Sequence, residues 1–374
     1  PVIYLDYAAN TPVDPAVLER FCQLEHEWVG NPNASHRAGR AARAELARIT
    51  DSIASLLGVH PSEILYTSGA SEANNTAVKG LVQAAGTAGR HVISTPLEHA
   101  SINGCLEFLR TQGYTVDLLN LRSDGTVDLA HLDALLRVDT VLVSVCAVDS
   151  ELGIQQPIEA IAAHLQNYPN CRFHVDATQA VGRTDLSFSC ADTMSFAPHK
   201  FYGLNGSGIL LKRRRIPLMP LIHGGGSMTA YRSGTPALAL AGAAEAALRL
   251  ALAGLQERTG LVRRWNTILR SALSAYPNVQ INSPETAVPH ILNLSIAGVK
   301  GTAFQRALDE RGFCVSVQSA CSEDGAPSRA VFALSGDRKR ALSAWRISLS
   351  HLTTAQEIQS FLSAFHDCYE NLAG

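Results

Sequence analysis

The sequence predicts an α/β protein with a mainly parallel sheet, followed by a smaller α+β region. Three observations support this class. Short β-branched runs alternate with longer helical stretches, which is the pattern of parallel strands joined by helical crossovers. Several predicted strands end directly in Gly, Ser, Thr, His or Asp, at the sheet edge where open α/β folds bind ligands. From about Leu238 the pattern changes to a long helical region and then to short strands and helices.

The predicted elements follow in an order that fits this class. Strands in the first part cover residues 63–67, 91–94, 140–145, 172–175, 193–196 and 208–211. Helices between them cover residues 38–57, 71–84, 102–112 and 157–167. The second part has helices over 238–275, 302–310 and 354–372, and strands over 279–281, 291–295, 314–317 and 344–348. Residues 322–340 are polar with few apolar side chains, so we expect a mobile loop there.

Composition excludes several classes of function. The chain has 374 residues, of which 46% are hydrophobic and 17% charged, with a net charge of −2. That length allows a large core and two domains. Near-neutral charge argues against direct nucleic-acid binding, which needs a concentrated basic surface. No stretch approaches the roughly 18–20 uninterrupted apolar residues of a membrane span, because Glu245 and Arg249 interrupt the most apolar region.

The cysteines and the first residues indicate the compartment. Eight cysteines are scattered without CxxC pairs or histidine spacing suited to zinc, so we expect reduced thiols and no metal site. The first residues lack the basic region, apolar run and cleavage site of a signal peptide. We therefore expect a cytoplasmic protein.

Two strand ends carry residues suited to an anionic, ring-containing ligand. Residues 67–75 pass from a strand through small residues into a helix, whose first N–H groups form an anion site with the Ser71 hydroxyl. An ordinary helix cap by Ser68 or Ser71 is the alternative. Asp176 directly follows a buried strand, where its carboxylate could pair with a protonated pyridine nitrogen or cap a helix.

Two more strand ends carry a lysine and a histidine. Lys200 follows a strand in a partly apolar sequence, where burial would lower its pKa and make it a Schiff-base amine. Most lysines are merely solvated, and that alternative stays open. His99 follows the strand over 91–94 and could stack on a planar cofactor and move protons, or be structural.

One cysteine differs from the others in its position. Cys321 follows a strand at the start of the polar 322–340 stretch, where a thiol would be exposed and reactive. The remaining seven occupy apolar or helical contexts, and we expect them to be buried: Cys22, Cys105, Cys146, Cys171, Cys190, Cys314 and Cys368.

The order and wording of these motifs resemble cysteine desulfurases of the nitrogen-fixation and iron–sulfur-cluster type, in the class V aminotransferase family. The matching motifs span the chain and lie at residues 4–9, 31–32, 67–70, 98–99, 174–179, 199–200, 232–235 and 319–321. The resemblance implies a homodimeric pyridoxal-phosphate enzyme of fold type I. It also implies a large cofactor-binding domain over 12–250 and a small domain over 1–11 with 251–374 that carries the cysteine loop.

The same resemblance assigns roles to single residues. Lys200 would hold pyridoxal 5′-phosphate covalently, His99 would stack on its ring, and Asp176 would pair with the ring nitrogen. The substrate L-cysteine would be held by its carboxylate at Asn31 and Arg346. Cys321 would take its sulfur as a persulfide, leaving L-alanine, for delivery to an acceptor protein in iron–sulfur cluster assembly or tRNA thiolation. The remaining cofactor contacts would come from Gly69, Ala70, Ser71, Ser150, Gln179, His199 and, from the other subunit, Thr235.

Two positions depart from the family pattern. Ser150 stands where relatives usually have Asn at the phenolic side of the cofactor, and Ala197 replaces a serine that usually contacts the phosphate. We expect both to weaken the grip on the cofactor. Two other functions stay open: a related cysteine, cystine or selenocysteine lyase that does not need Cys321, and a non-catalytic homologue that serves as a binding or assembly subunit.

Overall fold

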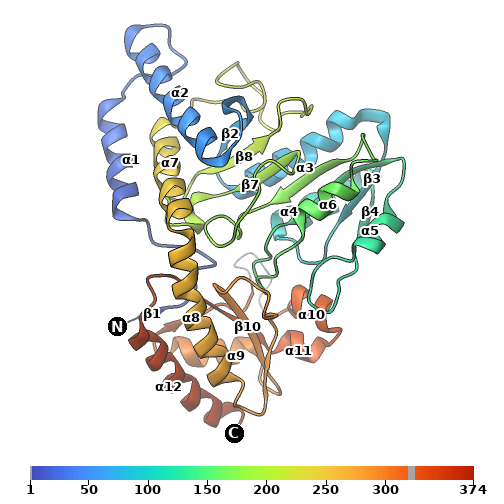
Figure 1. Cartoon of the computed structure of the whole chain (residues 1–374), viewed down its shortest axis with the longest axis vertical. Coiled ribbons are helices and arrows are strands. Elements are labelled where there is room, and N and C mark those ends of the chain that lie inside the picture. The colour runs from blue at the N-terminus through green and yellow to red at the C-terminus, as the bar shows by residue number, and fades with distance from the viewer. Residues whose placement is uncertain (1, 319–324) are drawn as a thin grey trace.

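A seven-stranded sheet forms the centre of the larger part of the molecule. The computed structural model describes residues 2–318 and 325–374 (Figure 1). The strand order is β2-β8-β7-β6-β5-β3-β4, in which β4, β3, β5, β6 and β7 are mutually parallel and β8 runs antiparallel to both its neighbours. The strands are β2 (Ile64–Thr67), β3 (His91–Ser94), β4 (Thr115–Leu118), β5 (Thr140–Cys146), β6 (Arg172–Asp176), β7 (Thr193–Phe196) and β8 (Gly208–Lys212). The predicted mainly parallel sheet is confirmed.

Helices cover this sheet and complete the first core. They are α1 (Pro15–Glu27), α2 (Arg37–Leu57), α3 (Ala70–Ala85), α4 (Ala100–Thr111), α5 (Leu129–Leu135), α6 (Ile158–His164) and α7 (Leu238–Ala253). In α2 the buried residues Leu46, Ile49 and Ile53 recur at helical spacing, and the helix ends at Gly58, whose φ of 66° suits the left-handed cap. Helix α7 is apolar nearly all round and packs against α1 and α2, which agrees with burial rather than a solvent face.

A second core fills the smaller part at the bottom of Figure 1. Its sheet has the order β12-β10-β9, and β1 pairs in parallel with β11. Phe304 stacks on Trp345 with ring centres 5.2 Å apart. The elements are β1 (Ile3–Tyr4), β9 (Val279–Ile281), β10 (Ile291–Ile296), β11 (Phe313–Cys314), β12 (Ala344–Ser348), α8 (Leu255–Leu273), α9 (Gly301–Asp309), α10 (Arg329–Ser335), α11 (Arg338–Leu342) and α12 (Ala355–Leu372).

The single helix expected over 238–275 is in fact two helices. Helices α7 and α8 meet at Gly254 and are bent by 66°. Within the described residues no helix by itself has the length and apolarity to cross a membrane, and only this bent pair, taken together, meets that composition. The strand expected over 314–317 is also shorter: β11 ends at Cys314, and beyond it Ser316 forms an isolated bridge with Arg346.

The expectation of a mobile loop over 322–340 is wrong for its described second half. Helices α10 and α11 occupy that stretch, and Ala330, Val331 and Ala341 are buried against Leu97 and Cys146. Three apolar side chains are enough to hold this stretch because they pack on a surface that the large part of the molecule already forms. The polar composition of the stretch therefore did not reveal that part of it is buried.

Candidate active site

A cavity of about 410 Å³ opens at the carboxyl ends of the parallel strands. This volume lies in the range of small-molecule and cofactor sites. Its position is the one expected for open α/β sheets, where the ends of neighbouring strands bring separate motifs together. Predicted site residues that line it are Gly69, Ala70, Ser71, His99, Ser150, Asp176, Gln179, His199, Lys200 and Arg346.

The start of α3 forms one wall of this cavity. Gly69 is the N-cap residue, and it offers no side chain to bond the first N–H groups of the helix. The cap by Ser68 or Ser71 is therefore not the arrangement found; the Ser68 N–H instead donates to the Glu72 carboxylate at 2.6 Å. Uncapped N–H groups at a helix start, together with the Ser71 hydroxyl, suit a phosphate group.

Asp176 lies at the end of β6 and is buried. One carboxylate oxygen accepts from the Asn74 amide at 3.1 Å, and the other accepts from the Thr178 N–H at 3.0 Å. Asn74 is itself fixed by His174, 2.9 Å away. No helix begins at Asp176, so the capping alternative is not found. The carboxylate is held in one orientation on the cavity wall.

Lys200 ends a short 3-10 turn, Pro198–Lys200, that follows β7. Its ammonium group donates to the carbonyl oxygens of Ala8 at 2.8 Å and Ala9 at 2.7 Å. Burial, with further contributions from the nearby Arg183 and Arg346 guanidinium groups, lowers the pKa of Lys200 to about 8. A neutral fraction of this amine is therefore available near neutral pH, as nucleophilic attack requires.

His99 has both a structural and a cavity-facing role. It is the N-cap of α4, and its Nδ1 accepts from the Ser101 N–H at 3.1 Å. Burial is the main cause that lowers its pKa, so the imidazole is neutral at physiological pH. Because Nδ1 accepts, Nε2 carries the proton of the neutral ring.

His199 and Gln179 are held by the N-terminal segment, which we define as residues 5–11. The Nδ1 atom of His199 lies 2.9 Å from the Asn10 side-chain oxygen, and burial lowers the pKa of His199 to about 4. Gln179 donates to the Ala8 carbonyl at 2.9 Å and accepts from Arg183. A segment far away in the sequence thus fixes two predicted cofactor contacts.

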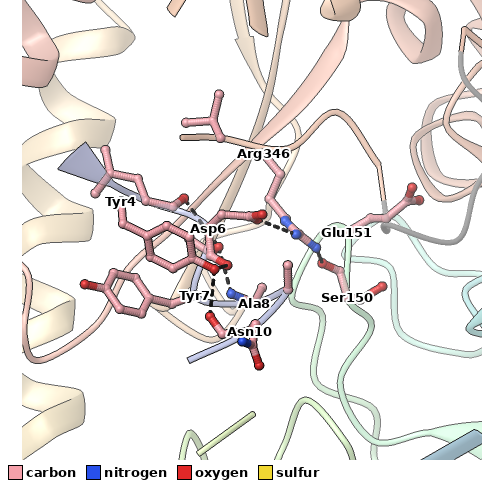
Figure 2. A network of polar contacts seen from close by, with 12 residues as sticks. Tyr4, Asp6, Tyr7, Ala8, Asn10, Ser150, Glu151 and Arg346 are labelled. Carbon is pink, nitrogen blue, oxygen red and sulfur yellow. Dashed lines mark hydrogen bonds and ion pairs between the residues drawn. The ribbon is translucent and has the colours of Figure 1, made fainter. Parts of the chain in front are cut away.

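Arg346 reaches the cavity from β12 in the smaller part of the molecule. Figure 2 shows its guanidinium group between Asp6 and Ser150. Nη2 donates to the Asp6 carboxylate at 2.9 Å, and Nη1 donates to the Ser150 backbone carbonyl at 2.7 Å. Ser150 therefore acts here through its backbone, which any residue type at this position would provide.

Asn31, Thr235 and Ala197 are not among the residues that line this cavity. Asn31 is exposed and accepts from the Asn33 N–H at 2.9 Å, so one chain does not bring it to the cavity. Thr235 lines a neighbouring cavity of about 270 Å³, and its assignment to the other subunit stays a prediction. Ala197 is fully buried and is not among the cavity-lining residues. Cys321 lies outside the described residues.

Sequence reasoning gave no role to several acidic residues at or beside the cavity. Glu98 is buried and accepts from the Thr95 hydroxyl at 2.6 Å and the Cys146 N–H at 3.0 Å, and burial raises its pKa to about 8. Burial also raises the pKa of Asp149 to about 7. Asp149 follows β5 by a few residues, so the rule of polar residues after strands could have found it. Asp6 carried no signal apart from the family motif.

The remaining cysteines differ in exposure. Cys105, Cys146, Cys171 and Cys368 are buried, as expected. Cys190 and Cys314 are partly exposed, and Cys22 is exposed on α1, so the expectation of burial is wrong for Cys22. Its helical context did not reveal which face of α1 it occupies.

These residues fit pyridoxal phosphate. The 68–71 turn offers uncapped N–H groups for a phosphate, Asp176 offers a fixed carboxylate for a ring nitrogen, and Lys200 offers an amine of lowered pKa. All three line one cavity of sufficient volume. The donor set therefore matches an anionic pyridine aldehyde.

The chain belongs to the class V aminotransferase family, whose family model, aminotransferase class-V, matches residues 3–361. Curated relatives narrow the assignment. The chain is 36% identical to a NifS/IcsS protein homolog of Lactobacillus delbrueckii subsp. bulgaricus, over 100% of this chain and 98% of that protein. It is 38% identical to the cysteine desulfurase IscS of Dechloromonas aromatica, over 97% and 91% of the two chains.

Solved structures agree with these relatives. A NifS-like protein superposes with a TM-score of 0.93 at 32% identity over 100% of both chains. The structure of SspA in complex with cysteine gives a TM-score of 0.80 at 29% identity, over 94% of this chain and 99% of that one. The chain is thus a member of the cysteine desulfurases of the NifS and IscS type. The resemblance drawn from the sequence, the fold type and the class of pyridoxal-phosphate-dependent enzyme are confirmed.

Proposed function

We propose that this chain converts L-cysteine to L-alanine and transfers the sulfur to Cys321, with pyridoxal phosphate held covalently at Lys200. The observation that carries this proposal is the meeting of Lys200, Asp176 and the uncapped start of α3 in one cavity of about 410 Å³. The reaction is inferred from membership in the family, and the residues of the cavity fit the cofactor that this reaction needs.

Each part of the cavity has a separate task. When bound, pyridoxal phosphate supplies an electron sink that stabilises negative charge at the Cα of the substrate. The 68–71 turn and His199 hold its phosphate, and Asp176 holds its ring nitrogen. Lys200, freed by substrate binding, removes and returns protons because its lowered pKa lets it exist in both forms near pH 8. Arg346 binds the substrate carboxylate.

Cys321 is the proposed sulfur acceptor within the chain. Its thiolate attacks the substrate sulfur, the S–S bond forms as the Cβ–S bond breaks, and the carbon takes up the electron pair and then a proton to give alanine. Support comes from the NifS and IscS relatives and from the place of Cys321 in the sequence, between β11 and α10, both of which lie near the cavity.

The assembly and the surroundings are also proposals. We propose a homodimer in which Thr235 of one chain contacts the cofactor of the other, an acceptor protein that receives the persulfide, and a cytoplasmic location. The division into residues 12–250 and 1–11 with 251–374 is supported by one apolar core whose buried residues all come from 1–11 and 251–374, and by a larger one that comes mainly from 12–250. Free thiols at all seven described cysteines agree with a reducing compartment.

The test uses the purified holoenzyme incubated with L-cysteine. We expect alanine in amounts that match protein-bound persulfide in the first turnover, and continued turnover when an acceptor thiol is added. Cys321→Ser should keep the yellow cofactor and form neither alanine nor persulfide at the native rate. Sulfide release by Cys321→Ala at the native rate would instead identify a related lyase, and a protein that retains no cofactor would identify a non-catalytic homologue.

A further inference from the structure

Asp6 is the counter-ion of the arginine that binds substrate in the proposed function. The side chain of Arg346 is 2% exposed, and within the described chain its only ion pair is with Asp6, at 2.9 Å. A buried guanidinium without a counter-ion is strongly unfavourable. Before substrate binds, the Asp6 carboxylate therefore compensates the charge that the substrate carboxylate will meet.

The bonding of Arg346 leaves room for a second carboxylate. Each terminal nitrogen of a guanidinium carries two hydrogens. Nη2 uses one for Asp6 and Nη1 uses one for the Ser150 carbonyl, so each keeps one hydrogen, and Arg346 lines the cavity (Figure 2). The Nε atom is buried without a partner. A substrate carboxylate can thus bind the two terminal nitrogens while Asp6 stays in place.

The backbone around Asp6 fixes the position of its carboxylate. The Tyr4 hydroxyl lies 3.0 Å from the Asp6 carbonyl and 2.9 Å from the Asn10 carbonyl, which closes the turn between them. Asp6 also pairs in a parallel bridge with Ser348, two residues after Arg346 on β12. The backbones of Asp6 and Arg346 are therefore held by the same small sheet.

We propose that Asp6 is a positioning residue that orients the guanidinium of Arg346 and limits the strength with which it binds a substrate or product carboxylate. This inference rests on the proposed role of Arg346. Two carboxylates on one guanidinium repel each other, so Asp6 weakens the binding of a substrate carboxylate. At the same time, Asp6 holds the Arg346 guanidinium in position before substrate binds. Weaker carboxylate binding favours the release of the product alanine. Without it, alanine would be held as tightly as cysteine, because the two carboxylates have the same charge and geometry.

The two effects of Asp6 are separable by substitution. Asp6→Asn keeps an oxygen acceptor for Nη2 and removes the negative charge, whereas Asp6→Ala removes both. We expect Asp6→Asn to lower the dissociation constant of the holoenzyme for L-alanine by about fivefold and to lower KM for cysteine more than it changes kcat. Asp6→Ala should bind alanine more weakly than Asp6→Asn, because the guanidinium loses one of its two contacts.

Calorimetric titration of the holoenzyme with L-alanine tests this, with L-alaninamide as a ligand that lacks the carboxylate. Asp51→Asn, an exposed change on α2, is the matched control and should leave both ligands unaffected. Native alanine affinity in Asp6→Asn, or an equal change for alaninamide, would overturn the proposal. Arg346→Lys distinguishes a failure of the proposed function from a failure of this inference. Unchanged alanine binding in Arg346→Lys would refute the proposed role of Arg346 itself. Weakened binding in Arg346→Lys, together with native binding in Asp6→Asn, would refute only the role of Asp6.

Discussion

At the scale of single residues, the burial of Lys200 and the charges around it set the pH at which it can react. Burial is the largest cause that lowers its pKa, Arg183 and Arg346 lower it further, and Asp6 and Asp176 raise it, which brings the pKa to about 8. The neutral amine is the reactive form, and for a base it becomes more abundant as pH rises. Lys200 therefore gains reactivity as pH rises through about 8 rather than near the value of about 10.4 for an exposed lysine.

This gives a prediction for the apoprotein. The rate of covalent cofactor attachment should rise with pH and level off above about pH 8. Stopped-flow absorbance after mixing apoprotein with pyridoxal phosphate measures the rate at each pH. A rate that still climbs steeply near pH 10, as for free lysine, would show that the Lys200 pKa is not lowered.

Covalent attachment itself is a second prediction. Borohydride treatment of the yellow holoenzyme should fix the cofactor on the peptide that contains Lys200. Lys200→Ala should retain no borohydride-fixed cofactor and lose activity, whereas Lys300→Ala, at an exposed position, should behave as the native protein. Peptide mass spectrometry identifies the labelled lysine, and label at another lysine would refute the assignment.

Individual site residues could be predicted from the sequence where a simple rule applied. Asp176, His99 and the 68–71 turn follow strands that run in the same direction, and such strands bring their carboxyl ends to one edge of the sheet. The roles of Asn31 and Ala197 were carried over from family motifs, and the role of Asn31 in substrate binding stays a prediction. Asp6 was missed because its partner, Arg346, lies far away in the sequence, and no local pattern reveals such a pair.

At the scale of elements, the approach of β8 to the start of α3 depends on a glycine. A Cβ at Gly208 would lie 2.5 Å from the backbone of Gly69, closer than atoms can approach. Gly208→Ala should therefore displace the uncapped turn and weaken cofactor retention on dialysis. Gly104→Ala on α4 is the control, since a Cβ there meets nothing within 4 Å. Equal retention in both variants would show that the turn tolerates displacement.

The packing of α10 gives another prediction at this scale. Val331 is 1% exposed, and its neighbour Phe332 is 51% exposed. Val331→Ala removes two buried methyl groups and should destabilise the docking of α10 by roughly 2 kcal/mol. Because α10 lies shortly after Cys321 in the chain, alanine formation should slow while cofactor retention stays native. Phe332→Ala should change neither, and a slower reaction in both variants would point to the helix surface instead.

Most strands were predicted to within one residue of their ends, but β1 and β4 were not predicted and β11 is shorter than expected. Strands β3, β7, β9 and β12 have the expected bounds. Helices α10 and α11 were missed because each is short and polar apart from a few residues, so their stability comes from packing rather than from local pattern.

At the scale of the whole molecule, two cavities lie side by side and share Ser68. The second is lined by residues 227–229, by Arg232 and by residues 234–236, which include Thr235. Arg232 pairs with Glu72 at 2.8 Å, so this region is tied to the start of α3 in the same chain. In a two-fold dimer such a region can serve the neighbouring subunit while it stays attached to its own.

Subunit complementation tests this arrangement. Thr235→Glu places a negative charge where the phosphate of the partner's cofactor would lie, and Lys200→Ala removes the attachment site. Each homodimer should be inactive, and mixed dimers formed by refolding the two variants together should regain one functional site of two. Sedimentation shows whether the refolded protein is dimeric, and the rate of cysteine turnover measures the activity of the restored site. No recovery in proven mixed dimers would place Thr235 within its own subunit's site.

The N-terminal segment also determines when the site can form during synthesis. The ribosome makes residues 5–11 long before their partners, since Leu5 bonds to Cys314 and Ser348, and Asp6 pairs with Arg346. Its Ala8 and Ala9 carbonyls also hold Lys200. A nascent chain therefore carries Lys200, Asp176 and the phosphate turn long before the strands that seat its own beginning emerge. Stable capture of the cofactor should therefore wait until β12 has left the ribosome.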